Sequence, residues 1–426
     1  MNYTEISAAV KADSFKLATL EESIRNRALK AIIHGLDAAS DAIFAANIKD
    51  LDKAKTEALP QPIINRLKFN ESKLDDCLSG LESLISLDDP LFKQLFKRQL
   101  DEELTLIKTT CPIGVIGVIF ESRPDALIQI SSLCIKSGNC AILKGGSEAA
   151  NTNKILFDTI YQAGISAGLP HGFITLVESR AGIDELLKCH ESIDLLIPRG
   201  SNQFVQYIMA NSKIPVMGHA DGVCHVYVDK DADITKAIPI IFDSKTQYVA
   251  ACNTAETLLV HQNIAKEFLP KLIEATGGKI QYRGDEATAT IIPCEPANDK
   301  DFETEYLDYI LSIKIVADLD AAITHINKYG SHHTDCIITQ NNPSAKTFMA
   351  NVDSAGVYQN CSTRFADGFR YGFGAEVGIS TGKLHARGPV GLDGLVTYKY
   401  KLFGNGQIVE DYATGKSKFN FKNLID

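Results

Sequence analysis

The chain has 426 residues, of which 45% are hydrophobic and 23% are charged, an ordinary composition for a globular protein of two or three domains. Its net charge of −10 argues against nucleic acid or an acidic membrane surface as the main partner. No stretch approaches the roughly 20 apolar residues of a membrane helix, and ten cysteines without disulfide-like clustering favour reduced thiols in the cytoplasm.

The first hundred residues predict helices, interrupted by the proline-containing segment LDKAKTEALPQP. From about residue 113, short apolar runs alternate with segments of helix length. These runs are GVIGVIF (114–120), CAILK (140–144), FITLV (173–177) and DLLIP (194–198). Strands that are apolar on both faces and joined through helices indicate a parallel sheet covered on both sides.

A second alternation of the same kind follows the loop MGHADGV (217–223). Its apolar runs are CHVYVD (224–229), ETLLVH (256–261), KIVADL (314–319) and DCIIT (335–339). We therefore expect two doubly wound α/β domains in series, the first over residues 1–222 and the second over residues 223–390.

Two segments outside these alternations look like strands that cannot form a core alone. One is EELTLIKTT, a strand expected within residues 99–111, and the other is the tail over residues 391–426. Their tyrosine and phenylalanine content favours pairing across subunits. The sequence thus predicts a small β oligomerisation element and at least a homodimer.

Two strand-to-helix turns are candidate phosphate-binding sites. AILKGGSEA places Lys144 at a strand end before two glycines, and LLIPRGSNQF places Gly200 and Ser201 in the same situation. Small residues at a helix N-terminus bind phosphate through free backbone N–H groups. Ordinary strand-to-helix turns also use glycine and a capping serine, so both interpretations remain open at this point.

Cys252, in QYVAACNTAETLLVHQ, precedes a predicted strand, a position from which a side chain can face a cleft. A lone cysteine is more often a small buried hydrophobic residue than a nucleophile. The chain contains no C-x-x-C or H-E-x-x-H motif, and the pair His332-His333 is interpreted as a loop feature rather than a ligand set. No metal site is predicted.

Cations in loops predict an anion pocket. Arg123 follows a strand in FESRPD, and Arg364 lies in NCSTRF. Lys383, His385 and Arg387 lie together in STGKLHARGP. Each could be a surface charge, which is the usual case for arginine, but guanidinium groups also suit carboxylate and phosphate.

Several segments together resemble the γ-glutamyl phosphate reductase (glutamate-5-semialdehyde dehydrogenase) family, a branch of the aldehyde dehydrogenase superfamily. They include PIGVIGVIFESRPDALIQ, AILKGGSEA, LIPRGSNQFV, GHADGVCHVYVD, AACNTAETLLVH and GFGAEVGISTGKLHARGPVG. The resemblance runs from end to end and implies an aldehyde-dehydrogenase-like fold. It also implies NADPH-dependent reduction of γ-glutamyl phosphate to glutamate 5-semialdehyde, the second step of proline biosynthesis, in an NADPH-binding first domain and a catalytic second domain.

The resemblance also implies roles for individual residues. Cys252 matches the nucleophile that forms a thioester, and the catalytic set is completed by Asn253 beside it and by Arg123 as an oxyanion or phosphate ligand. The implied cofactor-binding residues are Lys144 at the adenosine ribose, Ser147, Gly200 and Ser201, with Glu376 at the nicotinamide ribose. The implied substrate-binding residues are Ser122, Arg123, Arg364, His385 and Arg387.

Two departures from relatives bear on the reaction. Hydrolytic aldehyde dehydrogenases carry a water-activating glutamate where this chain reads MGHADGV, with His219 and Asp221, which suits a reductase. Ser147 stands where this family usually has a lysine that favours the 2′-phosphate of NADPH.

Alternative functions remain at this point. A hydrolytic or coenzyme A-dependent aldehyde dehydrogenase would keep the cysteine, and a catalytically silent homologue would act as a binding partner of a glutamate kinase. A contact with glutamate 5-kinase is also expected of an active enzyme that receives the labile acyl phosphate directly.

Overall fold

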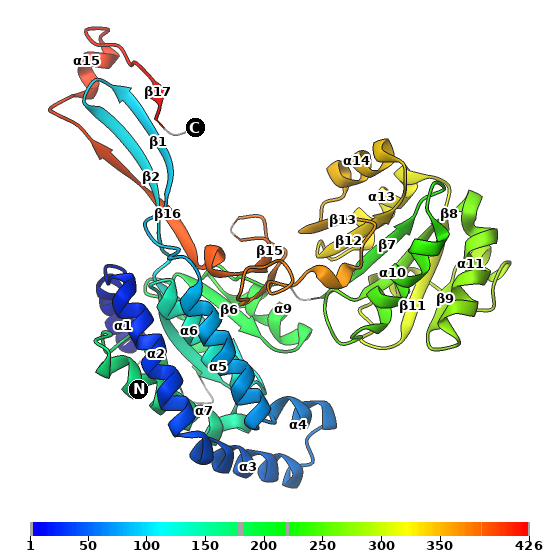
Figure 1. Cartoon of the computed structure of the whole chain (residues 1–426), viewed down its shortest axis with the longest axis horizontal. Helices are drawn as coiled ribbons and strands as arrows, with labels where there is room; N and C mark the ends of the chain where they lie inside the picture. The colour runs from blue at the N-terminus through cyan, green and yellow to red at the C-terminus, as the bar shows by residue number, and fades with distance from the viewer. Residues whose placement is uncertain (1–2, 178–181, 219–220, 385, 425–426) are drawn as a thin grey trace. The chain divides into compact units, whose positions relative to one another are not determined.

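The computed structural model describes residues 3–177, 182–218, 221–384 and 386–424. The chain divides into two compact units (Figure 1). The first comprises Met1–Met217 with Gly391–Asp426, and the second comprises Gly218–Val390. The division lies within the loop 217–223.

The N-terminal part of the first unit is helical, as predicted. Its helices are α1 (Tyr3–Leu17), α2 (Glu22–Ala38), α3 (Ser40–Thr56), α4 (Gln61–Leu67) and α5 (Glu71–Ser86). The proline-containing segment separates α3 from α4, with a proline in the first turn of α4, where its missing N–H costs no helical hydrogen bond.

The first unit is built on a four-stranded parallel sheet. Its strands are β3 (Val115–Phe120), β4 (Cys140–Gly145), β5 (Ile174–Leu176) and β6 (Leu195–Arg199), in the order β5-β4-β3-β6. The connecting helices are α6 (Pro124–Lys136), α7 (Ala150–Ser166), which follows the turn η1 (Ser147–Ala149), α8 (Gly182–Lys188) and α9 (Asn202–Asn211). The order reverses between β3 and β6, and ligands of open α/β sheets bind at the carboxyl ends of strands at such a point.

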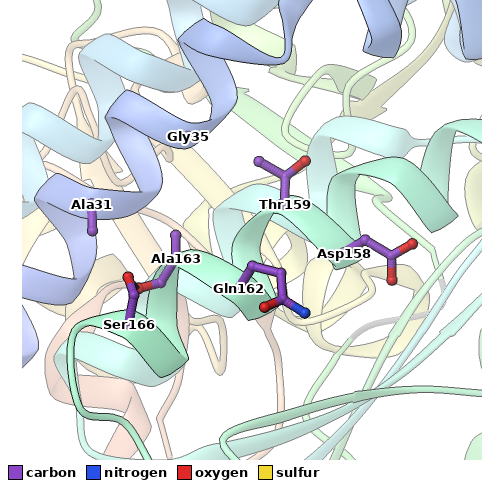
Figure 2. Close-up of a pocket in the computed structure, with 7 residues that line it drawn as sticks. All are labelled: Ala31, Gly35, Asp158, Thr159, Gln162, Ala163 and Ser166. Atoms are coloured by element: carbon purple, nitrogen blue, oxygen red, sulfur yellow. Dashed lines mark hydrogen bonds between the residues drawn. The ribbon is translucent and has the colours of Figure 1, made fainter.

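Helices α2 and α7 leave a hollow of about 530 Å³ between them (Figure 2). Short side chains line much of it, including Ala31 and Gly35 of α2 and Ala163 of α7. A Cβ atom on Gly35 would lie 3.3 Å from Thr159, so the glycine permits close approach of the two helices. The carboxylate of Asp158 at the rim pairs with Lys154 on the same helix. The hollow is therefore a feature of helix packing.

A second, antiparallel sheet in the first unit joins β1 (Gln94–Asp101), β2 (Leu104–Pro112), β16 (Val396–Phe403) and β17 (Lys422–Asn423). The order is β16-β2-β1-β17 (Figure 1), and the short helix α15 (Val409–Ala413) lies between β16 and β17 in the chain. The strand expected within 99–111 is present as β2, and its partner β1 was not predicted. The chain turns at Glu102-Glu103, where Glu103 adopts a φ of +53° without the usual turn glycine.

The C-terminal tail pairs with these strands inside the same chain, and pairing across subunits stays a prediction. Strand β16 runs antiparallel to β2, and β17 runs antiparallel to β1. The two outer strands of this sheet are therefore segments of the tail.

The second unit is built on a seven-stranded parallel sheet. In sheet order its strands are β10 (Glu295–Pro296), β9 (Gln281–Gly284), β11 (Ile310–Val316), β8 (Ala255–His261), β7 (Cys224–Val228), β12 (Thr334–Ile338) and β13 (Gly356–Gln359). Helices α10 (Ile234–Thr246) and α11 (Gln262–Thr276) pack on one face, and α13 (Leu319–Tyr329) and α14 (Asn342–Asn351) on the other. The four-stranded sheet of β3–β6 and the seven-stranded sheet are thus both parallel and helix-connected, which confirms the predicted α/β class.

Strand β11 begins four residues and ends three residues earlier than expected for KIVADL. It ends at Val316 because Asp318 accepts a hydrogen bond from the Ala321 N–H and so begins α13. Shorter elements complete the description: α12 (Glu286–Ala289), η2 (Asp299–Glu303), η3 (Thr363–Phe365), β14 (Gly378–Ser380), β15 (Gly388–Val390) and η4 (Leu392–Leu395). Within the described ranges, no helix is long and apolar enough to cross a membrane.

Candidate active site

Three neighbouring strands of the second unit begin beside one another and bring three reactive side chains together. Cys252 precedes β8, Cys224 is the first residue of β7, and His333 immediately precedes β12. In the sheet these strands are adjacent in the order β8-β7-β12. Because parallel strands start at the same edge, the three residues converge at the amino edge of the sheet.

The turn that carries Cys252 is held by local hydrogen bonds. The Thr254 hydroxyl donates to the Tyr248 carbonyl at 2.7 Å, and the Thr254 N–H donates to the Ala251 carbonyl at 2.9 Å. A Cβ atom on Gly222 would overlap the backbone of Cys252, so a glycine is required there. Cys252 itself is half-buried, which leaves its thiol in a fixed but accessible position.

His333 is the residue in closest hydrogen-bonding contact with the thiol. Its Nε2 lies 3.2 Å from Cys252 Sγ, and its Nδ1 lies 2.9 Å from the hydroxyl oxygen of Thr334. His333 is fully buried. The sequence analysis interpreted the His332-His333 pair as a loop feature and so missed this contact. The contact depends on the strand order that places β12 beside β7, and the sequence does not specify this order.

The remaining thiols differ from Cys252 in their surroundings. Cys224 donates a hydrogen bond to the Cys252 carbonyl at 3.3 Å, and burial raises its pKa well above the ordinary value. Burial also raises the pKa of seven more thiols, those of Cys77, Cys111, Cys134, Cys140, Cys294, Cys336 and Cys361. These groups are therefore poor nucleophiles at neutral pH.

Arg364 is the predicted cation that the structure associates with Cys252. It is only 7% exposed, and its Nε donates to Gln247 at 2.9 Å. Burial and the charge of Arg370 lower its pKa, while a negative charge on Cys252 opposes that change. Asn253 donates from Nδ2 to the Ala366 carbonyl at 2.8 Å. This bond ties the turn of Cys252 to the loop that carries Arg364.

Two other predicted cations, Lys383 and Arg387, contact a carboxylate instead. Lys383 lies 2.5 Å from Asp353, and Arg387 lies 3.0 Å from the other oxygen of the same group. These cations hold the pKa of Asp353 below its ordinary value. Arg387 is thus paired with Asp353. His385 and His219 lie outside the described residues.

In the first unit, Ser122 and Arg123 follow β3, and both side chains contact carboxylates. Ser122 has a φ of +51°, and its N–H and hydroxyl donate to Glu148 at 2.6 and 2.8 Å. Arg123 pairs with Asp125 at 3.0 Å. Burial opposes ionisation of Asp125, but Arg123 and Lys73 hold its pKa below the ordinary value. A strained serine at a strand end is typical of functional turns.

The predicted cofactor residues lie at the carboxyl ends of β4 and β6. Lys144 is the next-to-last residue of β4, with its Nζ 2.9 Å from the Gly145 carbonyl, and burial lowers its pKa although Glu148 opposes this. Ser201 caps α9 with its hydroxyl and donates its own N–H to Glu121 at 3.3 Å. Ser147, the first residue of η1, is exposed.

This edge of the first sheet fits a dinucleotide. The turns after β3, β4 and β6 meet where the strand order reverses. The carboxylate of Glu121 already lies against the N-terminus of α9, where a Cβ atom on Gly200 would approach it within 2.6 Å. An anion therefore fits this helix N-terminus.

In the second unit, Glu376 accepts a hydrogen bond from the Gly368 N–H at 2.7 Å. This contact fixes the carboxylate on the loop that follows Arg364. Among the described residues, no group of His, Cys, Asp and Glu side chains is arranged to hold a metal ion.

Comparisons with a family model, with curated proteins and with a solved structure agree. The model of the aldehyde dehydrogenase family matches residues 4–294. The γ-glutamyl phosphate reductase of Ruminiclostridium cellulolyticum is 57% identical over 425 residues, covering 100% of this chain and 98% of that protein. The one from Acetivibrio thermocellus is 56% identical and covers 100% and 99%. A crystal structure of γ-glutamyl phosphate reductase from Thermotoga maritima matches with a TM-score of 0.94 at 38% identity, covering 96% of this chain and 100% of that chain.

Proposed function

Because the chain belongs to the aldehyde dehydrogenase family, in its γ-glutamyl phosphate reductase branch, we propose that it reduces γ-glutamyl 5-phosphate to glutamate 5-semialdehyde and phosphate. This is the second step of proline biosynthesis from glutamate. The observation that carries the proposal is the half-buried Cys252 thiol beside His333, on a turn tied to the loop of the buried Arg364.

Cys252 attacks the γ-carbonyl carbon of the acyl phosphate, which expels phosphate and leaves a γ-glutamyl thioester. Arg364 binds the phosphoryl group, since a buried guanidinium offers paired N–H donors to phosphate oxygens. The Cys252 backbone N–H and Arg123 stabilise the oxyanion. Asn253 acts by holding the Arg364 loop against the turn of the nucleophile.

NADPH is the proposed cofactor, and when bound it supplies the hydride that reduces the thioester. Lys144, Ser147, Gly200 and Ser201 bind its adenosine and phosphate groups at the carboxyl edge of the first sheet, and Glu376 orients its nicotinamide ribose. Collapse of the hemithioacetal on Cys252 then releases the aldehyde. The loop MGHADGV has no glutamate to activate water, which supports reduction over hydrolysis of the thioester.

Substrate recognition completes the proposal. Ser122 and Arg123 bind the acyl phosphate from the turn after β3, and His385 and Arg387 bind the glutamyl carboxylate. For Arg387 this requires exchange of its contact with Asp353 for the carboxylate of the substrate.

We also propose that the protein acts in the cytoplasm as at least a homodimer, and that it receives the labile acyl phosphate from glutamate 5-kinase. All ten cysteines are unpaired, which fits a reducing compartment. The antiparallel sheet exposes Tyr398, Tyr400 and Leu402 on β16, apolar area that a second subunit would cover.

Mass spectrometry tests the proposed covalent step. Incubation with glutamate 5-semialdehyde and NADP+, without phosphate, should add one glutamyl group to the peptide that contains Cys252. Added inorganic phosphate should remove that group, whereas coenzyme A should not. Failure of phosphate to remove it, or its removal by coenzyme A alone, would refute the proposed reaction.

A further inference from the structure

We infer that His333 is the acid–base residue of this reaction: its imidazole accepts the proton of the Cys252 thiol and delivers it to the leaving phosphate. The identity of the leaving group rests on the proposed function. Activation of the thiol rests on geometry, because Nε2 of His333 lies 3.2 Å from Cys252 Sγ. An imidazole at this distance is within reach for proton transfer.

A base requires the tautomer of His333 with its proton on Nδ1, which lies next to the Thr334 hydroxyl. An imidazole that donates its Nδ1–H to the Thr334 hydroxyl, 2.9 Å away, keeps the lone pair on Nε2. That lone pair faces the thiol. Cys224 lies 3.8 Å from the same Nδ1, and its own S–H donates to the Cys252 carbonyl. Thr334 is therefore a positioning residue for the base.

The titratable groups around His333 contact other partners or stay protonated. His333 is therefore the base that contacts the thiol. On β12, Asp335 accepts from the His225 N–H at 2.7 Å and from Ser354, so its carboxylate is engaged elsewhere. On β7, burial keeps Cys224 protonated. His332 contacts the carbonyl of Asp353.

Near the same edge of the sheet, Glu256 pairs with Lys245 at 2.6 Å. Two further titratable groups are Arg364, whose positive charge favours a thiolate, and Tyr358. Burial raises the pKa of the Tyr358 hydroxyl, so this group stays protonated. Neither group can accept the thiol proton at neutral pH.

The proton balance of acyl transfer is complete with this residue. The thiol proton moves to His333, the thiolate forms the C–S bond, and the C–O bond to phosphate breaks. The imidazolium then returns the proton to the departing phosphate, which leaves as the hydrogen phosphate dianion. Neutral His333 remains beside the thioester sulfur. After reduction, the thiolate released by the hemithioacetal takes up a proton from solvent through the same imidazole.

Alkylation of Cys252 by iodoacetamide tests thiol activation without any substrate. The rate, measured from pH 5 to 9 by mass spectrometry of the Cys252 peptide, should fall about tenfold or more near pH 6 in His333→Gln. The profile should also move toward that of an ordinary thiol, which has a pKa of about 8.5. Thr334→Val keeps the imidazole and should cause a smaller shift in the same direction.

His332→Asn is the matched control, since asparagine tolerates the φ of +59° at this position and the His332 ring contacts Asp353 rather than Cys252. Its alkylation profile should equal that of the unmodified chain. An unchanged profile in folded His333→Gln would overturn the inference. If His333→Gln does not fold, an unchanged profile in Thr334→Val would overturn it instead.

The two proposals fail separately in this design. Loss of Cys252 reactivity in His333→Gln, without phosphate-dependent turnover by the unmodified chain, would keep His333 as the base and reject the proposed function. Phosphate-dependent turnover together with unchanged alkylation in His333→Gln would keep the proposed function and reject His333 as the base. In the active enzyme, His333→Gln should lower kcat by about 10²-fold or more in both directions.

Discussion

The Nε2 atom of His333 lies 3.2 Å from the Sγ atom of Cys252, although 81 positions separate the two residues in the chain. Strands β8, β7 and β12 are neighbours, so their starting points bring the two side chains together. The contact between the proposed nucleophile and the proposed base therefore depends on the strand order of the second unit.

Arg364→Gln should raise the KM for inorganic phosphate in the reverse reaction by about 10-fold to 100-fold, because a charge-assisted hydrogen bond contributes about 1.5–3 kcal/mol. The KM for glutamate 5-semialdehyde should change less than about 2-fold. Steady-state kinetics with NADP+ at saturation measure both constants.

Arg370→Gln is the control for charge removal from the same loop. Arg370 donates to the Arg364 carbonyl and pairs with Asp367, so its loss should affect the phosphate KM less. A selective rise in the semialdehyde KM of Arg364→Gln would instead assign Arg364 to the glutamyl carboxylate.

Ser147→Lys should increase the preference for NADPH over NADH by about 5-fold to 10-fold, since an exposed lysine at the start of η1 adds about 1 kcal/mol of attraction for a 2′-phosphate. The ratio of kcat/KM for the two cofactors measures the effect. Gln162→Lys adds the same charge to an exposed site on α7 and should leave the ratio unchanged. An equal gain in both variants would argue against a cofactor phosphate near residue 147.

His325→Leu should reduce the loss of stability in acid. Burial lowers the pKa of His325 to about 3 from its ordinary value of 6.5, with His225, Lys314 and Lys328 adding to the effect. Between these values the unfolded chain binds a proton that the folded chain does not, so stability falls as pH drops below about 6.5. The contribution is about 2 kcal/mol at pH 5.

Urea unfolding of the second unit at pH 7.5 and pH 5.0 measures this difference. The difference in the free energy of unfolding between the two pH values should be smaller in His325→Leu than in the unmodified chain. His34→Gln, which removes an exposed imidazole from α2, should leave the shift unchanged. An equal acid shift in all three proteins would show that His325 is not the group responsible.

Tyr400→Asp with Leu402→Asp should convert the proposed dimer to a monomer, measured by light scattering at micromolar concentration. Both side chains are more than half exposed on one face of β16, 57% and 58% respectively. A charge on each would stay unpaired in an apolar interface. Lys399→Asp, on the opposite face of the strand, should leave the mass unchanged, and a monomeric unmodified chain would reject the interface.

Much of the architecture is predictable from the sequence, because burial on both faces leaves continuous apolar runs in parallel strands. Strand order is not, since a run such as CHVYVD (224–229) does not specify its neighbours. For this reason Cys252 could be identified as a candidate, whereas His333 could not. The hairpin of β1 and β2 was missed because its turn uses Glu103 in a left-handed conformation, without a glycine signal.

The predicted arginines have different kinds of partner in the structure, for a related reason. A loop arginine is recognisable in sequence, but its partner is not. Arg123 pairs with Asp125, two positions further on, and Arg387 pairs with the distant Asp353. Arg364 instead lies buried with its Nε on Gln247. Arg123 and Arg387 must therefore exchange a carboxylate partner to bind a substrate anion, whereas the Nε of Arg364 contacts a neutral amide.

The most direct test of the central claim is the reverse reaction, glutamate 5-semialdehyde with NADP+, followed by NADPH absorbance with and without inorganic phosphate. With phosphate, NADPH should form continuously. Without phosphate, it should stop at no more than one equivalent per Cys252, because the thioester has no acceptor. Continuous formation of NADPH without phosphate would mean that water cleaves the thioester, and it would contradict the assignment of the chain as a phosphate-dependent reductase.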